Sequence, residues 1–180
     1  MSEDYTHIIQ GCRRRNADAM RELYDKTASM AMGVCMRYAG DRSTAQDWMQ
    51  DGYIRVYEKI DSLKNPERLM GWVYQVMVHI CLNHCKKRSK VLYLDELEEE
   101  PLPDNPLPYS AEEVFAAMKQ LPVSLRTAFN LVTVEEYDYR QAAEEMGCQQ
   151  STVRAMHSRA CARLREILTG AEKSEKMKKE

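Results

Sequence analysis

A segment near the end of the chain combines amide, hydroxyl and guanidinium side chains in a pattern that suits contact with nucleic acid. The predicted start of a helix there carries four such polar side chains, Gln149, Gln150, Ser151 and Thr152. Together with the backbone N–H groups of a helix start, they can donate to phosphates and to base edges. Arginines follow with no acid before Glu166, at Arg154, Arg159, Arg163 and Arg165. Guanidinium groups on the flanks of a helix suit contacts to backbone phosphate.

Two helices joined by a tight turn are predicted to position these groups. Asp138 and Gln141 have the spacing of a capping box, and Gly147 is the residue best able to end that first helix in a left-handed conformation. The second helix has an apolar face at Val153, Met156, Ala160 and Leu164. This arrangement is the helix-turn-helix pattern. The alternative is an ordinary pair of core helices with a solvated basic face. The glycine turn and the presence of arginines without acidic residues favour DNA binding.

A second polar surface is predicted on one side of a helix that begins near residue 69. Its members combine aromatic, amide, imidazole and basic groups, namely Tyr74, Gln75, His79, Asn83, Lys86, Lys87 and Arg88. Bases of a single strand stack on rings while cations follow the phosphates, so single-stranded nucleic acid is one interpretation. The other interpretation is a helix end whose cations interact with the helix dipole. These residues alone leave both interpretations open.

The same helix also contains residue types that bind metals or react in redox chemistry. His79, Cys81, His84 and Cys85 lie within seven residues, and the two cysteines share a helix face. Cys81 falls on the predicted apolar stripe, however, and no second ligand pair stands nearby, so we predict no metal site. Phosphate-binding glycine loops, nucleophile elbows and paired catalytic carboxylates with a histidine are absent from the sequence. We therefore expect neither an enzyme nor a cofactor.

The composition limits how nucleic acid could be bound. The chain has 180 residues with 26 basic and 28 acidic side chains, a net charge of −2. Basic charge must therefore be clustered if it is to serve DNA. The sequence has no leading apolar run with a cleavage site and no apolar run of membrane-spanning length. We expect a cytoplasmic protein that does not insert into a membrane and whose six cysteines are reduced.

Helical periodicity dominates, which predicts an all-α protein with two small helical domains. Helix starts are expected at Asn16, at Ser43 with Gln46, at Asn65 with Pro66, and at Ser110 with Glu113. Residues 91–110 hold four of the six prolines and a run of acids, and are predicted to be a flexible acidic linker. The predicted domains are therefore residues 1–90 and 111–170, followed by a charged, frayed tail at residues 171–180.

The chain resembles bacterial sigma factors of the extracytoplasmic-function type over about residues 17–168. In the second domain the resemblance rests on Leu121-Pro122, Arg126, Phe129, Tyr139, Ala142-Ala143-Glu144, Gly147, Thr152-Val153-Arg154 and Arg159-Ala160. In the first domain it rests on Leu23-Tyr24, Ala45-Gln46-Asp47, Gln50-Asp51-Gly52-Tyr53 and Trp72-Val73-Tyr74. Two matching blocks in the family's order, separated by an acidic linker, are more specific than either block alone. The implied fold is a region-2-like bundle followed by a region-4-like helix-turn-helix module.

The resemblance implies a role for each surface. Core RNA polymerase would be bound at two places, its β′ clamp helices and its β flap. The residues that contact the β′ clamp helices would be Asp47, Gln50, Asp51 and Arg55. The −35 element of promoter DNA would be read by Gln149, Gln150, Ser151, Thr152, Arg154, Ala155, Ser158 and Arg159. The melted −10 strand would be captured by the side of the helix that carries Tyr74 to Arg88. An anti-sigma factor is a further expected partner. A regulator whose first domain binds a ligand instead of polymerase is the alternative, and it would bind duplex DNA tightly by itself.

Overall fold

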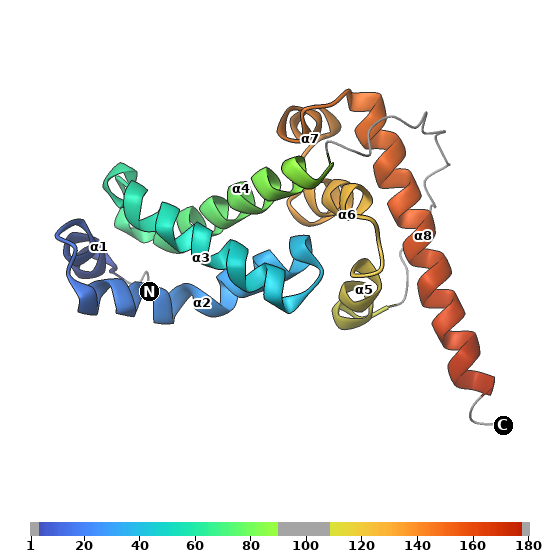
Figure 1. Ribbon diagram of the computed structural model, residues 1–180, viewed down its shortest axis with the longest axis horizontal. Helices are drawn as coiled ribbons and strands as arrows, with labels where there is room; N and C mark the ends of the chain where they lie inside the picture. Colours follow the sequence, from blue (N-terminus) through green and yellow to red (C-terminus); the bar gives the residue numbers. More distant parts are fainter. Residues whose placement is uncertain (1–3, 90–108, 178–180) are drawn as a thin grey trace. The chain divides into compact units, whose positions relative to one another are not determined.

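The computed structural model describes the backbone of residues 4–89 and 109–177 and the side chains of residues 4–88 and 109–170. All regular elements in these ranges are helices, which confirms the all-α prediction. The chain divides into two compact units, Met1–His84 and Cys85–Glu180 (Figure 1). The predicted linker at 91–110 lies almost entirely outside the described residues. None of the described helices is both long and apolar enough to cross a membrane.

The first unit is built on the pairing of two long helices, α2 (Ala17–Ala39) and α3 (Arg42–Lys59) (Figure 1). One face of α2 is buried in the core, and it includes Leu23, Thr27, Ala31, Val34, Cys35 and Tyr38. Thr27 Oγ1 donates to the Leu23 carbonyl and lies 2.7 Å from the Tyr53 hydroxyl of α3, which satisfies polar groups inside the core. Gly52 of α3 lies where a β-carbon would collide with Met77, so the small residue allows close packing.

Short helical elements complete this unit. Helix α1 (Thr6–Arg13) packs on α2, and η1 (Ile60–Ser62) and η2 (Pro66–Arg68) connect α3 to α4 (Leu69–Ser89). Arg13 Nη2 donates to the Leu63 carbonyl at 2.7 Å, and Arg15 Nη1 donates to the Tyr57 carbonyl at 3.0 Å. These bonds fasten the end of α1 to the end of α3 and the connection that follows it.

The helix starts test the capping predictions directly. The side chains of Asn16 and Asn65 accept backbone N–H groups as predicted, and Gly40 ends α2 in a left-handed conformation. The prediction for α3 was wrong, because its N-cap is Asp41, whose carboxylate accepts from Thr44 N at 2.9 Å. Asp41 caps the N–H of Thr44, whereas Ser43 would have capped the N–H of Gln46. The helix therefore begins two residues earlier than predicted.

The second unit gathers short helices along one long helix. Helices α5 (Ala111–Met118), α6 (Val123–Phe129) and α7 (Tyr139–Met146) all pack on α8 (Gln150–Met177), with the π-helical turn η3 (Asn130–Val134) after α6. Part of the core consists of Ala117, Met118, Leu121, Phe129, Ala160, Leu164 and Leu168. Buried Arg126 donates to the carbonyls of Lys119 and Leu121 at 3.3 Å, so it satisfies groups left open where α5 ends. Helix α8 continues to Met177, into the tail that was predicted to be frayed.

Both capping boxes of the second unit are present as predicted. Ser110 and Glu113 cap α5 reciprocally, and Asp138 and Gln141 do the same at α7. Gly147 has φ +69° and ends α7, with its N–H donating to the Ala143 carbonyl at 2.8 Å. The turn to α8 therefore has the tight, left-handed geometry that the helix-turn-helix prediction required.

We predict that alanine substitutions at two exposed glycines change stability in opposite directions. Gly147→Ala places a β-carbon in a left-handed conformation and should destabilise the second unit by roughly 1–2 kcal/mol. Gly33→Ala, in the interior of α2 with open space around it, should stabilise the first unit by roughly 0.5–1 kcal/mol. Urea unfolding curves of both variants measure this. A destabilising Gly33→Ala would contradict the helical assignment.

Candidate nucleic-acid and polymerase interface

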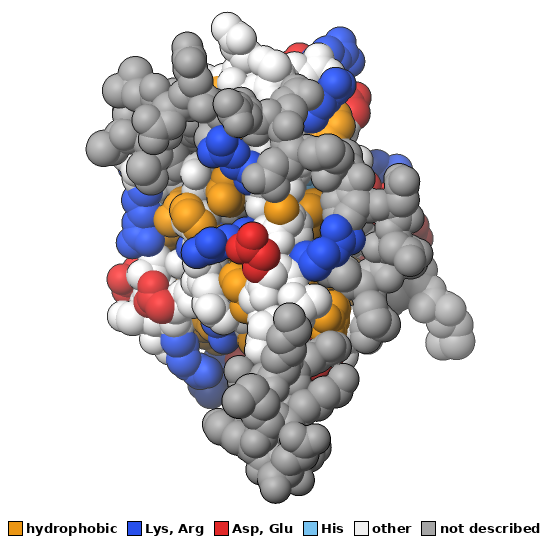
Figure 2. Space-filling view, turned by 90° about the vertical axis from the view of Figure 1, so that its right-hand side faces the viewer, with side chains coloured by type: hydrophobic (Ala, Val, Ile, Leu, Met, Phe, Trp, Pro, Cys, Tyr) orange, Lys and Arg blue, Asp and Glu red, His pale blue; other side chains and the backbone are white. Residues whose placement is uncertain are grey.

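The turn between α7 and α8 presents most of the residues predicted to read duplex DNA. Gln149, Gln150, Ser151 and Arg154 are exposed, and Thr152 and Arg159 are partly exposed. The first turn of α8 contains no acidic residue. Because the first N–H groups of a helix lack partners within the helix, this end can donate hydrogen bonds to a phosphate or a base edge. Figure 2 views the molecule from the side on which Figure 1 draws α8, and Lys and Arg are more frequent there than Asp and Glu among the coloured side chains.

Two members of the predicted set do not belong to this exposed surface. Ala155 and Ser158 are each only 2% exposed. A side chain without solvent access cannot contact a base, so neither is available to DNA in this structure. Both were assigned to the −35 element by the family resemblance, which carries no information about burial in this chain. Of the predicted set, the exposed and partly exposed members are therefore the only candidates for DNA contact.

The buried His157 of α8 connects the helix-turn-helix module to the residues packed behind it. His157 Nε2 lies 2.9 Å from Thr133 Oγ1, and His157 Nδ1 lies 3.1 Å from the Tyr139 hydroxyl. Its ring stacks on Phe129 at 6.1 Å and meets Tyr139 edge-on at 5.8 Å. Burial lowers the pKa of His157 below its ordinary value, because the charged ring would lose hydration. The ring is therefore neutral at pH 7, with one nitrogen donating and the other accepting.

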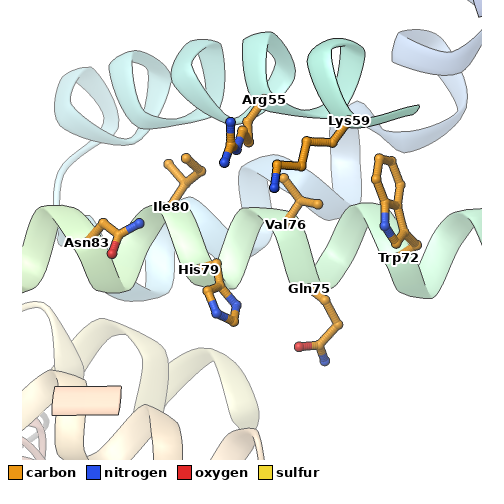
Figure 3. A pocket seen from close by; sticks show the side chains of 8 residues that line it. All are labelled: Arg55, Lys59, Trp72, Gln75, Val76, His79, Ile80 and Asn83. Carbon is orange, nitrogen blue, oxygen red and sulfur yellow. The ribbon is translucent and has the colours of Figure 1, made fainter. Parts of the chain in front are cut away.

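In the first unit, α3 and α4 enclose a groove of about 270 Å³, which we call the α3–α4 groove (Figure 3). Its lining residues are Arg55, Lys59, Trp72, Gln75, Val76, His79, Ile80 and Asn83. In Figure 3, Arg55 and Lys59 project from α3 toward α4, whereas Gln75 and His79 project from the outer side of α4. The groove thus offers cations, an aromatic ring and amides in one place, which are the groups that bind a single strand.

The groove combines predicted residues with others that sequence reasoning assigned elsewhere. Gln75, His79 and Asn83 line it as members of the predicted −10 set, and Lys86, Lys87 and Arg88 follow in the last turn of the same helix. Arg55 also lines it, although it was assigned to polymerase, and its Nη1 lies 3.2 Å from Glu58. Lys59 and Trp72 were missed. Their basic and aromatic types were a signal, but only the pairing of α3 with α4 shows that they face the same space.

Tyr74 is the predicted −10 residue that the structure separates from the others. It does not line the α3–α4 groove; its hydroxyl accepts from Arg37 Nη2 at 2.8 Å. The Arg37 guanidinium also lies 5.8 Å from the centre of the Tyr74 ring. Tyr74 is half-buried and is turned about 100° around the helix from Gln75. Its side chain therefore packs against α2 instead of joining the groove.

A second concave surface lies between α2 and α3, and we call it the α2–α3 hollow. It has a volume of about 520 Å³ and is lined by Tyr24, Met32, Gln46, Asp47, Met49, Gln50, Tyr53, Ile54 and Tyr57. Tyr24 is 41% exposed and Ile54 58% exposed, which are large apolar side chains for a surface. Asp47 and Gln50 stand beside them as predicted polymerase contacts. Burial raises the pKa of Tyr53 and of Tyr57 to about 12, so both hydroxyls stay neutral.

Asp51 lies next to this surface and has a partner of its own. His84 Nε2 is 2.9 Å from Asp51 Oδ2, and the His84 ring stacks on Trp48 at 4.9 Å with an angle of 5° between the planes. Trp48 is 3% exposed and therefore belongs to the core. The exposed carboxylate of Asp51 is thus oriented by a histidine from α4.

The four residues considered as a metal or redox site are not brought together. Cys81 is buried, with its sulfur 3.8 Å from that of Cys35, and His84 is stacked on Trp48. No group of three or more His, Cys, Asp or Glu suited to a metal occurs among the residues whose side chains the structure describes.

Comparison with known proteins decides the family. The Sigma-70 region 2 model matches residues 23–91, and the Sigma-70 region 4 model matches residues 111–164. The chain belongs to the sigma-70 family and is a sigma factor of the extracytoplasmic-function type. Its role is in transcription initiation by RNA polymerase.

Individual relatives agree with this assignment over most of their length. The sigma factor is 25% identical to the ECF RNA polymerase sigma-E factor of Haemophilus influenzae, over 89% of this chain and 94% of the relative. It is 28% identical to the ECF RNA polymerase sigma factor EcfG of Rhodopseudomonas palustris, over 84% and 86%. The solved sigma factor RpoE of Bartonella quintana, in complex with the anti-sigma factor NepR, has a similar fold, with 20% identity, a TM-score of 0.50 and coverage of 83% and 96%.

We predict that the sigma factor loses stability in acid partly through His157. An unfolded histidine has a pKa of about 6.5, and the folded value is lower. As pH falls through 6.5 toward the folded pKa, the unfolded chain takes up the proton first, so this contribution is lost. Thermal melts between pH 7.5 and 5.5 should therefore show a smaller decrease in Tm for His157→Gln than for the parent. His79→Gln, at an exposed position, is the matched control and should retain the parent's decrease.

Proposed function

We propose that this sigma factor directs core RNA polymerase to promoters through three separate surfaces. The start of α8 reads the −35 element, the α3–α4 groove holds the melted −10 strand, and the α2–α3 hollow with the exposed side of α3 binds polymerase. The observation that carries the proposal is the exposed, acid-free first turn of α8 after the left-handed Gly147 turn. Run-off transcription with core polymerase on a genomic promoter library tests it. Failure to direct initiation on any template would refute it.

The −35 proposal follows from which groups of α8 reach solvent. Gln149, Gln150, Ser151 and Thr152 supply donors and acceptors at the helix end, where a helix placed in the major groove contacts base edges. Arg154 and Arg159 follow one turn and more later with long side chains that reach either a base or a phosphate. Further along, Arg163 Nη1 lies 3.4 Å from Glu166, so part of its charge is balanced within the helix.

The −10 proposal follows from the chemistry of the α3–α4 groove. Val76 and Ile80 provide an apolar surface, and Trp72 provides a ring on which a base can stack. Arg55 and Lys59 supply positive charge for the phosphates, and Gln75, His79 and Asn83 supply hydrogen-bonding groups at the rim. A base taken out of the stack costs a few kcal/mol, which stacking on the protein can offset.

The polymerase proposal rests on the exposed apolar groups of the α2–α3 hollow. Tyr24 and Ile54 form an apolar centre, and Asp47 and Gln50 lie at its polar edge, an arrangement typical of protein interfaces. Asp51, oriented by His84, extends the polar edge toward α4. An anti-sigma factor is a further proposed partner, as the family resemblance implies. The Bartonella quintana sigma factor was solved with such a protein.

Substitution of Arg154 by alanine tests base reading at the −35 element. We expect discrimination between the preferred promoter and single-base variants to decrease by about 1–3 kcal/mol, the range for a good side-chain contact to a base. Transcription from matched templates that differ only upstream measures it. Arg163→Ala, in the ion pair with Glu166, is the control and should retain discrimination. A uniform loss on all templates would show that Arg154 contacts only phosphate.

Charge reversal at Asp47 tests the polymerase surface. Asp47→Arg should weaken binding of core polymerase by roughly tenfold, because it places a cation at an edge where the carboxylate is expected to meet a basic group. Fluorescence titration of labelled sigma factor with core polymerase measures the affinity. Asp18→Arg, an equal charge change at an exposed site at the start of α2, should leave the affinity unchanged. Equal affinities for parent and Asp47→Arg would remove Asp47 from the interface.

A further inference from the structure

We propose that Tyr139 is a positioning residue for DNA reading: its ring orients the Arg154 guanidinium, and the buried His157 orients Tyr139. The inference rests on the proposed role of Arg154 at the −35 element and adds two residues that do not themselves contact DNA. They make Arg154 selective by presenting it in one orientation.

The contact between Tyr139 and Arg154 joins the two helices of the helix-turn-helix module. Tyr139 is the first residue of α7, and Arg154 lies in the second turn of α8. The centre of the guanidinium lies 5.4 Å from the centre of the Tyr139 ring, within the range of a cation–π interaction. Arg154 remains exposed to solvent. The ring therefore supports the guanidinium without covering it.

Tyr139 is itself held at its other end. Its hydroxyl lies 3.1 Å from His157 Nδ1, and its ring meets the His157 ring edge-on. His157 is 8% exposed, stacks on Phe129, and contacts Thr133 Oγ1 through its second nitrogen. Both ring nitrogens thus have hydroxyl partners, so the histidine has a single orientation. A chain of contacts runs from the core of the second unit to the exposed guanidinium.

The orientation of Arg154 matters because an arginine side chain has many rotamers. Bidentate recognition of a base edge requires the guanidinium plane in one position, whereas a phosphate can be contacted from several. A side chain already held near the productive position loses less conformational entropy on binding. Tyr139 should therefore contribute to discrimination between bases more than to overall affinity for DNA.

A double-mutant cycle in the full-length sigma factor with core RNA polymerase tests this inference. The four proteins are the parent, Tyr139→Leu, Arg154→Ala and the double variant. The readout is the ratio of run-off transcript from a promoter selected in the genomic library to that from templates with single-base changes in its −35 element. Tyr139→Leu should lower this ratio by roughly three- to tenfold, the range expected for a cation–π contact. In the Arg154→Ala background, Tyr139→Leu should have no further effect.

Two further variants separate orientation from folding. Tyr139→Phe keeps the ring but loses the hydroxyl contact with His157, so it should lower the ratio by less than Tyr139→Leu. Its effect should likewise vanish in the Arg154→Ala background. If Tyr139→Leu does not fold, the cycle is completed with Tyr139→Phe. Tyr137→Leu, a partly buried tyrosine two residues earlier, is the matched control and should leave the ratio unchanged.

The outcomes distinguish this inference from the function on which it rests. If the effects of Tyr139 and Arg154 substitutions on the ratio multiply independently, Tyr139 does not act through Arg154 and the inference is overturned, while the function stands. An unchanged ratio in Arg154→Ala would overturn both the role of Arg154 and the inference. A loss of transcription that is equal on all templates, with the ratio intact, would show that Tyr139 is only structural.

Discussion

The second unit depends on the packing of its short helices against one long helix, α8. Helices α5, α6 and α7 contain 7 or 8 residues each, a length at which isolated helices are unstable in water. They persist because their apolar faces pack on α8, whose buried residues recur at helical spacing from Val153 to Leu168. The same helix that organises this core presents the proposed DNA interface at its first turn. Folding of the unit and the geometry of the interface are therefore coupled.

Helix α3 has three faces, and each borders a different part of the first unit. One face, including Ala45, Trp48 and Val56, is buried in the core. A second borders the α2–α3 hollow through Asp47 and Gln50. A third borders the α3–α4 groove through Arg55 and Lys59. Because these faces adjoin, neighbouring positions on one helix serve different partners in the proposed function, and Arg55 belongs to the groove and not to the hollow.

Buried or partly buried histidines hold more exposed polar groups in place in both units. His157 connects the core of the second unit to Tyr139, and His84 stacks on Trp48 while it contacts Asp51. In each case a ring packed against aromatic neighbours offers a nitrogen to a side chain nearer the surface. Such contacts restrict side-chain rotamers, so an exposed group meets a partner with less entropy to lose. The fold thus supplies orientation as well as a surface.

Local features could be predicted because they depend on residues close together in the chain. The caps at Asn16, Ser110 and Asp138 and the turn at Gly147 involve partners three or four residues apart, and the structure agrees with all of them. Apolar periodicity likewise predicted the all-α class and the buried face of α8 at Val153, Met156, Ala160 and Leu164. The N-cap of α3 was missed because Asp41 and Ser43 are both good caps and propensity alone does not choose between them.

The remainder of the site depended on contacts between distant parts of the chain. Tyr74 pairs with Arg37, 37 residues away, and so leaves the groove that its sequence neighbours line. Lys59 and Trp72 join that groove because α3 packs beside α4. Which residues of α8 reach solvent was likewise decided only in three dimensions, as buried Ala155 and Ser158 show. The sequence by itself determined the helical class and most helix caps, since these follow from short-range spacing, and its resemblance to known motifs indicated the family. The tertiary structure decided which side chains share a surface, because helical periodicity does not specify what each face meets.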